Sequence, residues 1–161
     1  MRTISLTNGG TAFVSNCDYA YLCRWTWHCN SGGYAARDEG NSRIPASRKR
    51  YRMHLEIAKR MGMSLTPQAD HQDRNRLNNQ RDNLRSAKRS EQLANRGKAK
   101  HNTSGYKGVF WHGGTQKWMA QIVVDRKAIY LGVFIKKKTA ARAYNTAATK
   151  YFGNFACLNE V

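Results

Sequence analysis

The stretch 69–85, ADHQDRNRLNNQRDNLR, decides how the first half of the chain is interpreted. It sets a carboxylate beside a histidine, at Asp70 and His71, and follows them with a connection rich in Asn and Arg that closes at Asn83. A carboxylate is an oxygen ligand for a hard cation such as Mg²⁺. A histidine that is neutral near pH 7 can accept a proton from water. These groups are the parts needed to hydrolyse a phosphodiester.

The charge of the chain indicates a polyanionic partner. It has 28 Lys and Arg against 10 Asp and Glu, a formal net charge of +18. Such a field attracts nucleic acid, and the binding should weaken steeply with salt because phosphate contacts release counterions. The alternative is a solvated basic surface of the ribosomal-protein kind. The cations expected to hold the phosphate backbone beside the Asp-His pair are Arg74, Arg76, Arg81 and Arg85.

The length and the cysteines set further bounds. A chain of 161 residues can form one ordinary domain or two small ones. The cysteines, Cys17, Cys23, Cys29 and Cys157, contain no C-x-x-C pair, so buried free thiols are favoured over a zinc site. There is no signal peptide and no long apolar run, so we expect a cytoplasmic protein that contacts no membrane.

The residue pattern of the first half predicts a β-rich extension followed by helices. Residues 1–50 hold short apolar runs broken by Asn-Gly, Gly-Gly and Ser, which predict strands in ISLTNGGTAFV, YLCRWTWHC and GGYAAR. Trp25 and Trp27 would share one face of the second run and are better core residues than base-stacking platforms. A helix is predicted over 51–63, ending at Gly62, and another over SEQLANR at 90–96.

The second half restarts as a separate unit after a polar, Lys-rich linker at 97–103. Three β-rich runs, GYKGVFWH, QKWMAQIVV and KAIYLGVF, predict an antiparallel meander. The following KKKTAARAYNTAATKYFG has Ala and aromatic residues at helical spacing and ends at Gly153. We therefore expect three strands packed on one helix, with Trp118, Tyr144 and Phe152 in the core beneath it.

The first half resembles the HNH endonucleases, in particular the small homing endonucleases of phages and introns. The resemblance runs over residues 1–96, with its core at about 51–96, and rests on Arg52-Met53-His54, on Asp70-His71 separated by eleven residues from Asn83-Leu84, and on Ser90, Glu91, Asn95 and Arg96. It implies a ββα-metal module. In such a module Asp70 would bind the metal, His71 would be the general base, and Asn83 would shape the loop and support the base.

Two positions stay open within this resemblance. The helix ligand of the family, His or Asn, should fall nine residues after Asn83, where this chain has Gln92. Either Gln92 is the third metal-site residue at a shifted distance or through water, or Asn95, one turn further on, replaces it. His54 would either support the site and contact a phosphate, or simply pack.

Residues 104–159 resemble the Apetala-two-type DNA-binding domain, which is also found fused to HNH nucleases. The runs YKGV, KWMAQI, YLGVF, AARAYNTAA and YFG fall in the family's order. The family lays its three-stranded sheet in the major groove of DNA, with strand side chains at base edges and phosphates. By position, the contacts expected here are Lys107, His112, Lys117 and Tyr130. Phe110, Val123 and Ala128 stand where the plant proteins use arginines, so the sequence preference should differ.

Together these features predict an α+β protein with an HNH nuclease domain at 1–96, a linker at 97–103 and a DNA-reading domain at 104–159. The expected activity is site-specific cleavage of double-stranded DNA by a single Mg²⁺, with Mn²⁺ able to substitute and no small-molecule cofactor. We expect a phage-encoded protein that acts as a monomer on DNA inside a bacterial host cell. The alternative is a DNA-binding regulatory protein whose nuclease site has decayed, which Gln92 favours and the intact Asp70-His71 pair opposes. An RNA-binding protein ranks lower, because no stacked-aromatic RNA motif is present.

Overall fold

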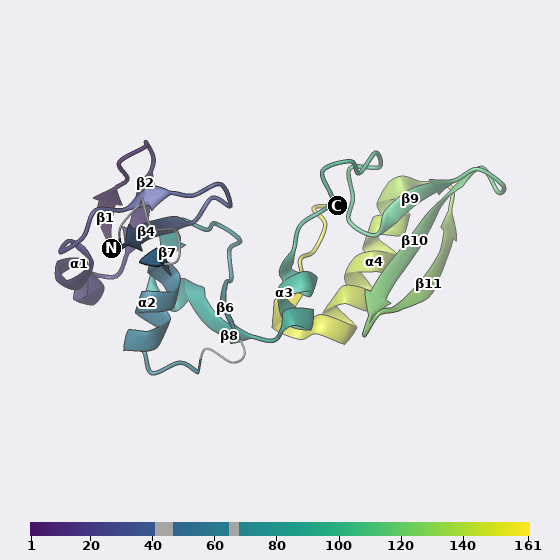
Figure 1. Ribbon diagram of the computed structural model, residues 1–161. Coiled ribbons are helices and arrows are strands. Elements are labelled where there is room, and N and C mark those ends of the chain that lie inside the picture. The colour runs from purple at the N-terminus through teal and green to yellow at the C-terminus, as the bar shows by residue number, and fades with distance from the viewer. Residues whose placement is uncertain (41–46, 65–67) are drawn as a thin grey trace. The chain divides into compact units, whose positions relative to one another are not determined.

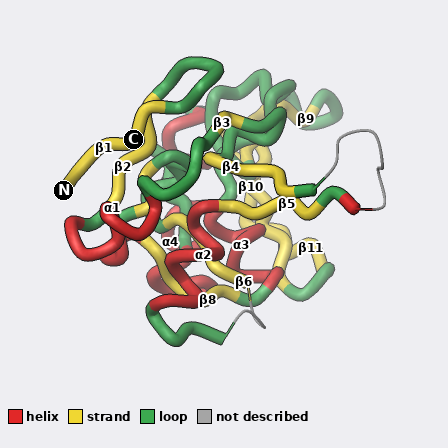
Figure 2. The backbone as a smooth tube through the Cα atoms, turned by 60° about the vertical axis from the view of Figure 1, so that its left-hand side comes forward, coloured by secondary structure: helices red, strands yellow, loops and turns green. Residues whose placement is uncertain are grey.

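The computed structural model describes residues 1–40, 47–64 and 68–161. The described residues alternate between helices and strands (Figure 2), which confirms the α+β class. Two compact units divide the chain, Met1–Lys88 and Arg89–Val161. This division falls before the predicted linker, so the helix at 89–95 and residues 97–103 are grouped with the second unit.

The first unit begins with a hairpin of β1 (Arg2–Ser5) and β2 (Thr11–Val14). Gly9 and Gly10 in its turn have φ of 88° and 91°, in the left-handed region that glycine adopts without a steric penalty. β7 (Asn78–Asn79) adds to β2 in parallel, and this pairing brings a distant segment next to the hairpin. The strands predicted in ISLTNGGTAFV are therefore confirmed.

The run YLCRWTWHC differs from its predicted strand. Its first two residues end helix α1 (Asn16–Leu22), and only β3 (His28–Cys29) is extended in a sheet. The reason is tertiary: the indole N–H of Trp27 donates a 2.9 Å hydrogen bond to the carbonyl of Leu22, at the end of α1. Trp27 is buried in the main core and Trp25 packs against it, so both are core residues, as predicted.

A second sheet leads into the helix that carries His54. It orders β3, β4 (Ala35–Glu39) and β5 (Lys49–Arg52), and α2 (Met53–Arg60) follows β5 directly. The helix predicted over 51–63 is found at 53–60, because residues 51 and 52 end β5, and Met53, Ile57 and Ala58 lie on its buried face. Gly62, with φ of 71°, follows the helix end, as expected for a glycine just beyond a C-terminus.

The remaining pair of the first unit is β6 (Gln68–His71) with β8 (Leu84–Ala87), antiparallel and joined through the connection 72–83. That connection contains β7 and a short 3₁₀ turn at Arg81–Asn83. The main core beneath these elements is formed by Ile4, Leu6, Ala12, Val14, Leu22, Trp27, Ala35, Met53, Ile57 and Leu84.

The second unit consists of α3 (Arg89–Asn95), a three-stranded sheet and α4 (Lys137–Phe152). The sheet is the predicted meander of β9 (Val109–His112), β10 (Lys117–Val124) and β11 (Lys127–Phe134). α4 covers one face of it (Figure 1). Two groups of buried residues lie between the sheet and α4. Tyr144 belongs to one of them, and Trp118 and Phe152 are partly buried against them, which confirms the prediction of all three as core residues.

Glycine permits close packing between this sheet and α4. Gly108, just before β9, has φ of 72°, and a Cβ at this position would overlap the ring of Tyr144.

The cysteines are all free thiols, but only Cys157 is buried. The expectation of buried thiols is wrong for Cys17 and Cys23, which are exposed: Asp18 and Leu22 form the buried face of α1, Cys17 lies off that face, and Cys23 follows the helix end.

A buried carboxylate joins three elements of the first unit. Asp18 on α1 has no exposed surface and accepts hydrogen bonds from Arg81 at 2.7 and 2.8 Å and from Arg60 of α2 at 2.9 Å. The hydrogen bond from Arg81 lowers the pKa of Asp18 below its ordinary value, in opposition to burial, which raises it. The ionised carboxylate is therefore the native form.

We expect Asp18→Asn to destabilise the first unit by about 2 kcal/mol at pH 7. Removing one partner of a fully buried pair costs roughly 3–5 kcal/mol, and the two arginines here are partly exposed and can be solvated. Because the folded pKa is depressed, this stabilisation is present above pH 3.8 and is lost as the pH falls through the folded value. Urea unfolding of both proteins at pH 7 and in acid measures it.

The matched control is Asp38→Asn, which also removes a carboxylate held by two arginines. The hydrogen bond from Arg50 lowers the pKa of Asp38 to about 2, but Arg48 and Arg50 are half exposed. Exposed ion pairs contribute little to stability. Equal losses in the two variants would show that burial of Asp18 is not what makes its ion pairs stabilising.

Candidate nuclease site and DNA-facing sheet

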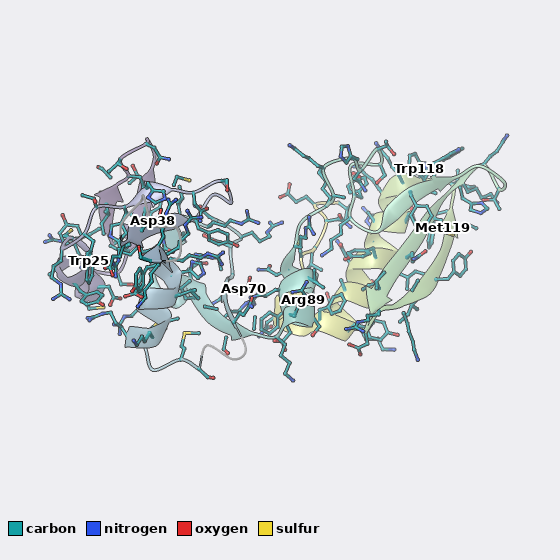
Figure 3. The ribbon with its side chains drawn as sticks, viewed as in Figure 1. Trp25, Asp38, Asp70, Arg89, Trp118 and Met119 are labelled. Carbon is teal, nitrogen blue, oxygen red and sulfur yellow. The ribbon has the colours of Figure 1, made fainter. Side chains whose placement is uncertain are left out.

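The candidate site lies where β6 ends in the first unit. Asp70 (labelled in Figure 3) and His71 are the last residues of β6, and their register partners on β8 are Arg85 and Leu84. Asp70 is half-buried, whereas the side chain of His71 is buried. Neighbouring strand residues point to opposite faces, so the carboxylate and the imidazole leave β6 on different sides.

The connection 72–83 is held by its own Asn and Asp side chains. The Asp73 carboxylate accepts hydrogen bonds from Asn78, Asn83 and the backbone N–H of Asn75, at 2.7–2.9 Å. The Asn83 amide also donates to the Asn78 carbonyl and accepts from the Asp73 backbone N–H. Burial raises the pKa of Asp73, but these hydrogen bonds outweigh it and the pKa is lowered. Asn83 therefore cross-links the loop, as one of its two predicted roles required.

The partner of His71 is Asn79, which the sequence did not single out. His71 Nε2 lies 3.1 Å from Asn79 Oδ1, and the Asn79 amide nitrogen donates to the Leu77 carbonyl. This second bond fixes the amide oxygen toward the imidazole, so Nε2 carries the proton and the lone pair of neutral His71 is on Nδ1. Burial lowers the pKa of His71, against the smaller opposing effect of Asn79. The imidazole is therefore neutral near pH 7.

His54 lies in the same buried group. Its ring centroid, in the first turn of α2, is 4.9 Å from that of His71 and 5.0 Å from that of Tyr34. Burial lowers the pKa of His54 to about 3, with smaller electrostatic contributions from the neighbouring His71 and Arg52, so His54 too is neutral near pH 7. Its Nδ1 is buried and has no hydrogen-bond partner among the described residues. This environment suits support of His71 better than contact with a phosphate.

The predicted cations divide into two pairs. Arg81 places its guanidinium on Asp18, and Arg85 donates to Asp70 at 3.2 and 3.3 Å. Both are therefore engaged by carboxylates. Arg74 and Arg76 are exposed, and Arg76 lies over the ring of Tyr34 while it donates to the Gly32 carbonyl.

The expected third metal residues fall outside this unit. Gln92 and Asn95 are both on α3, which belongs to the second compact unit, and Asn95 is buried. Within the described ranges no group of three or more His, Cys, Asp or Glu side chains is arranged to hold a metal ion. Asp73 and Asp70 are the carboxylates of the first unit that act electrostatically on His71, and Asp73 is held by Asn78, Asn83 and the Asn75 backbone N–H.

Of the predicted DNA contacts in the second unit, three lie on one face of the sheet and the fourth, Lys107, bonds the backbone near α3. His112 and Lys117 are register partners on the sheet, and Tyr130 is opposite Gln121 on the same face, away from α4. Lys107 is different: its ammonium group donates 2.6 Å hydrogen bonds to the carbonyls of Ala94 and Arg96. A lysine at this position satisfies the carbonyls at the end of α3.

Comparison with known protein families and with curated protein sequences finds no match for this chain. Of the described helices, none is long and apolar enough to cross a membrane.

We expect Asn83→Ala to loosen the connection 72–83 and to destabilise the first unit by about 1–2 kcal/mol. The variant loses three hydrogen bonds within the loop, each worth roughly 0.5–1.5 kcal/mol, and solvent replaces part of them. Hydrogen exchange at the Asp73 amide, which donates to Asn83, should become faster. The control is Gln80→Ala, which removes a single side-chain bond to Asn78 in the same loop. Unchanged exchange at Asp73 in the Asn83 variant would contradict the cross-linking role.

Proposed function

We propose that this protein is a metal-dependent HNH-type endonuclease that cuts double-stranded DNA, with a DNA-reading second unit of the Apetala-two type. The observation that carries the proposal is the buried, neutral His71 next to Asp70, above a loop locked by Asn83. Burial of two adjacent histidines in a chain of charge +18 has no structural need, because an apolar pair would fill the same space at less cost.

His71 suits the role of general base. A neutral imidazole can take a proton from the water that attacks the phosphorus, and a lowered pKa keeps it neutral at physiological pH. Asn79 holds the ring through Nε2, so the accepting nitrogen is Nδ1. His54 and Tyr34 pack against the ring and restrict its rotation. A base with a fixed ring loses less entropy when it engages the attacking water.

The residues present fit a hard divalent cation. Mg²⁺ in phosphate-processing sites usually binds one or two carboxylates and keeps several waters, and Asp70 provides one half-buried carboxylate. When bound, the ion would stabilise the negative charge that develops on the phosphate and on the leaving oxygen. Gln92 and Asn95, the residues expected to supply a further oxygen ligand, lie on α3 of the second unit. Arg85 neutralises Asp70 when no ion is bound, and a cation must compete with it.

The second unit would hold and select the DNA. It contains 13 Lys and Arg against three Asp and Glu, and its sheet leaves one face uncovered by α4. His112, Lys117 and Tyr130 on that face, with Arg74 and Arg76 of the first unit, are the proposed contacts. A covalently joined reader raises the effective concentration of the nuclease at its site, so weak DNA binding by the first unit suffices.

A second candidate function is DNA binding without cleavage. The ion pair between Arg85 and Asp70 favours it, because the guanidinium already satisfies the proposed metal ligand. Incubation of the protein with phage and bacterial genomic DNA and Mg²⁺, followed by mapping of the DNA ends, distinguishes the two. Recurrent ends with 5′ phosphates support the nuclease, and retention of DNA without ends supports the regulator.

We expect His71→Ala to lower the cleavage rate by roughly 10²–10⁴-fold, the usual effect of removing a general base, and to leave DNA affinity nearly unchanged. His101→Ala is the control, since His101 is exposed and lies outside the candidate site. Rates come from single-turnover cleavage, and affinity from binding in the presence of a chelator. Cleavage by the His71 variant within threefold of the unmodified protein would exclude His71 as the base.

We also expect a chelator to stop cleavage while binding persists, and Mn²⁺ to restore it. Asp70→Asn should need at least about tenfold more Mg²⁺ for half-maximal cleavage, because an amide lacks the charge that holds a hard cation. The matched control is Asp82→Asn, an exposed carboxylate in the same connection, which should titrate like the unmodified protein. Vigorous cutting in excess chelator would contradict the metal mechanism.

A further inference from the structure

The uncovered face of the second unit's sheet is mainly apolar. Register and alternation place nine side chains on it, opposite to α4: Phe110, His112, Lys117, Met119, Gln121, Val123, Ala128, Tyr130 and Val133. Trp118 and Met119, neighbours on β10 (labelled in Figure 3), mark the two faces, because Trp118 packs against the cluster under α4. Val123 is 56% exposed, Tyr130 61% and Phe110 38%.

This face contains no guanidinium. The strands β9, β10 and β11 have no arginine, although the unit as a whole is strongly basic. Arginine and lysine read guanine through hydrogen bonds to O6 and N7, and the one lysine on this face, Lys117, lies at the end of β10 and not at its centre. Apolar side chains instead contact the 5-methyl group of thymine, and Gln pairs with N6 and N7 of adenine. Gln121 lies between Met119 and Val123 in the middle of the apolar surface.

The cations lie at the two ends of β10. Lys117 begins the strand opposite His112, and Arg126 lies in the turn beyond its last residue. The eight residues of β10 span roughly 26 Å at ~3.3 Å each, more than the ~12 Å width of the major groove. Both ends can therefore reach phosphates while the centre faces base edges. An apolar protein partner would not need this separation of cations.

We propose that the outer face of β9–β11 reads A·T base pairs in the major groove, through apolar contact with thymine methyl groups and through Gln121 on adenine. This inference rests on the proposed DNA-reading function. Val123, Ala128 and Phe110 provide apolar contacts for the methyl group, and the one lysine of this face, Lys117, lies at the end of β10. Discrimination comes from these contacts, and the lysines and arginines supply affinity without sequence preference.

The test uses the full-length chain with a chelator present, so that no duplex is cut. Binding sites are selected from a random duplex library at one fixed salt concentration. In the enriched site, each thymine is then replaced singly by deoxyuridine, which removes the methyl group and nothing else. We expect enrichment of A·T pairs and a roughly fourfold loss of affinity at one or more thymines, the effect of one buried methyl-sized group.

Paired variants assign the effect to the face. Val123→Ser should abolish the difference between thymine and deoxyuridine at one position and leave affinity for the deoxyuridine duplex unchanged. Leu158→Ser is the matched control: Leu158 is an aliphatic residue, 50% exposed, that lies in the C-terminal segment after α4 and belongs to none of the three strands. It should keep the full difference.

The other outcomes separate the inference from the proposal beneath it. Tight binding to G·C-rich sites, or affinities that are the same for thymine and deoxyuridine, would overturn thymine reading while DNA binding stands. Identical behaviour of Val123→Ser and the unmodified chain on every duplex would show that the face serves another partner, and would also overturn it. Failure to enrich any duplex would overturn the DNA-reading function itself.

Discussion

The ion pairs of Asp18 are the constraint on which the candidate site depends. A carboxylate with no exposed surface is unfavourable by itself, and it is tolerated because Arg60 and Arg81 satisfy it. Arg60 comes from the helix that carries His54, and Arg81 from the connection that carries Asn79 and Asn83. One buried charge thus fixes α1, α2 and the loop before β8 to each other. The imidazoles of His54 and His71 meet because these elements cannot move independently.

The connection 72–83 follows the same logic with neutral groups. It is largely exposed and contains little regular structure, so its backbone N–H and C=O groups lack the partners that a sheet would give. The side chains of Asp73 and Asn75 accept hydrogen bonds from backbone N–H groups two residues further on, and Asn83 bonds backbone groups of Asp73 and Asn78. The Asn-rich composition is therefore a structural requirement of the loop. It leaves Asn79 to hold His71, which joins the loop's order to the position of the imidazole.

The sequence predicted the regular elements well and the pairing of charges poorly. The β1–β2 hairpin, α2 and the sheet with α4 follow from local period and turn residues, which act over a few positions. The misprediction at 21–29 arose because burial of Trp27 against the end of α1 outweighed β propensity. The sequence assigns no specific role to Asn79 or Asp73, and it predicts Arg81 as a phosphate contact although the Arg81 guanidinium bonds the Asp18 carboxylate. Local patterns cannot show that Asp18, more than sixty residues away, is its partner.

The same pairing changes how the large positive charge should be understood. Asp18, Asp38 and Asp70 each form an ion pair with at least one arginine. Part of the excess positive charge of the first unit is therefore neutralised within the fold. Cations that remain exposed can hold phosphates but cannot tell one sequence from another, since every nucleotide presents the same backbone charge. Selectivity then has to come from groups that touch base edges. In the described part of the second unit, the surface suited to this is the outer face of β9–β11, where apolar side chains outnumber charged ones.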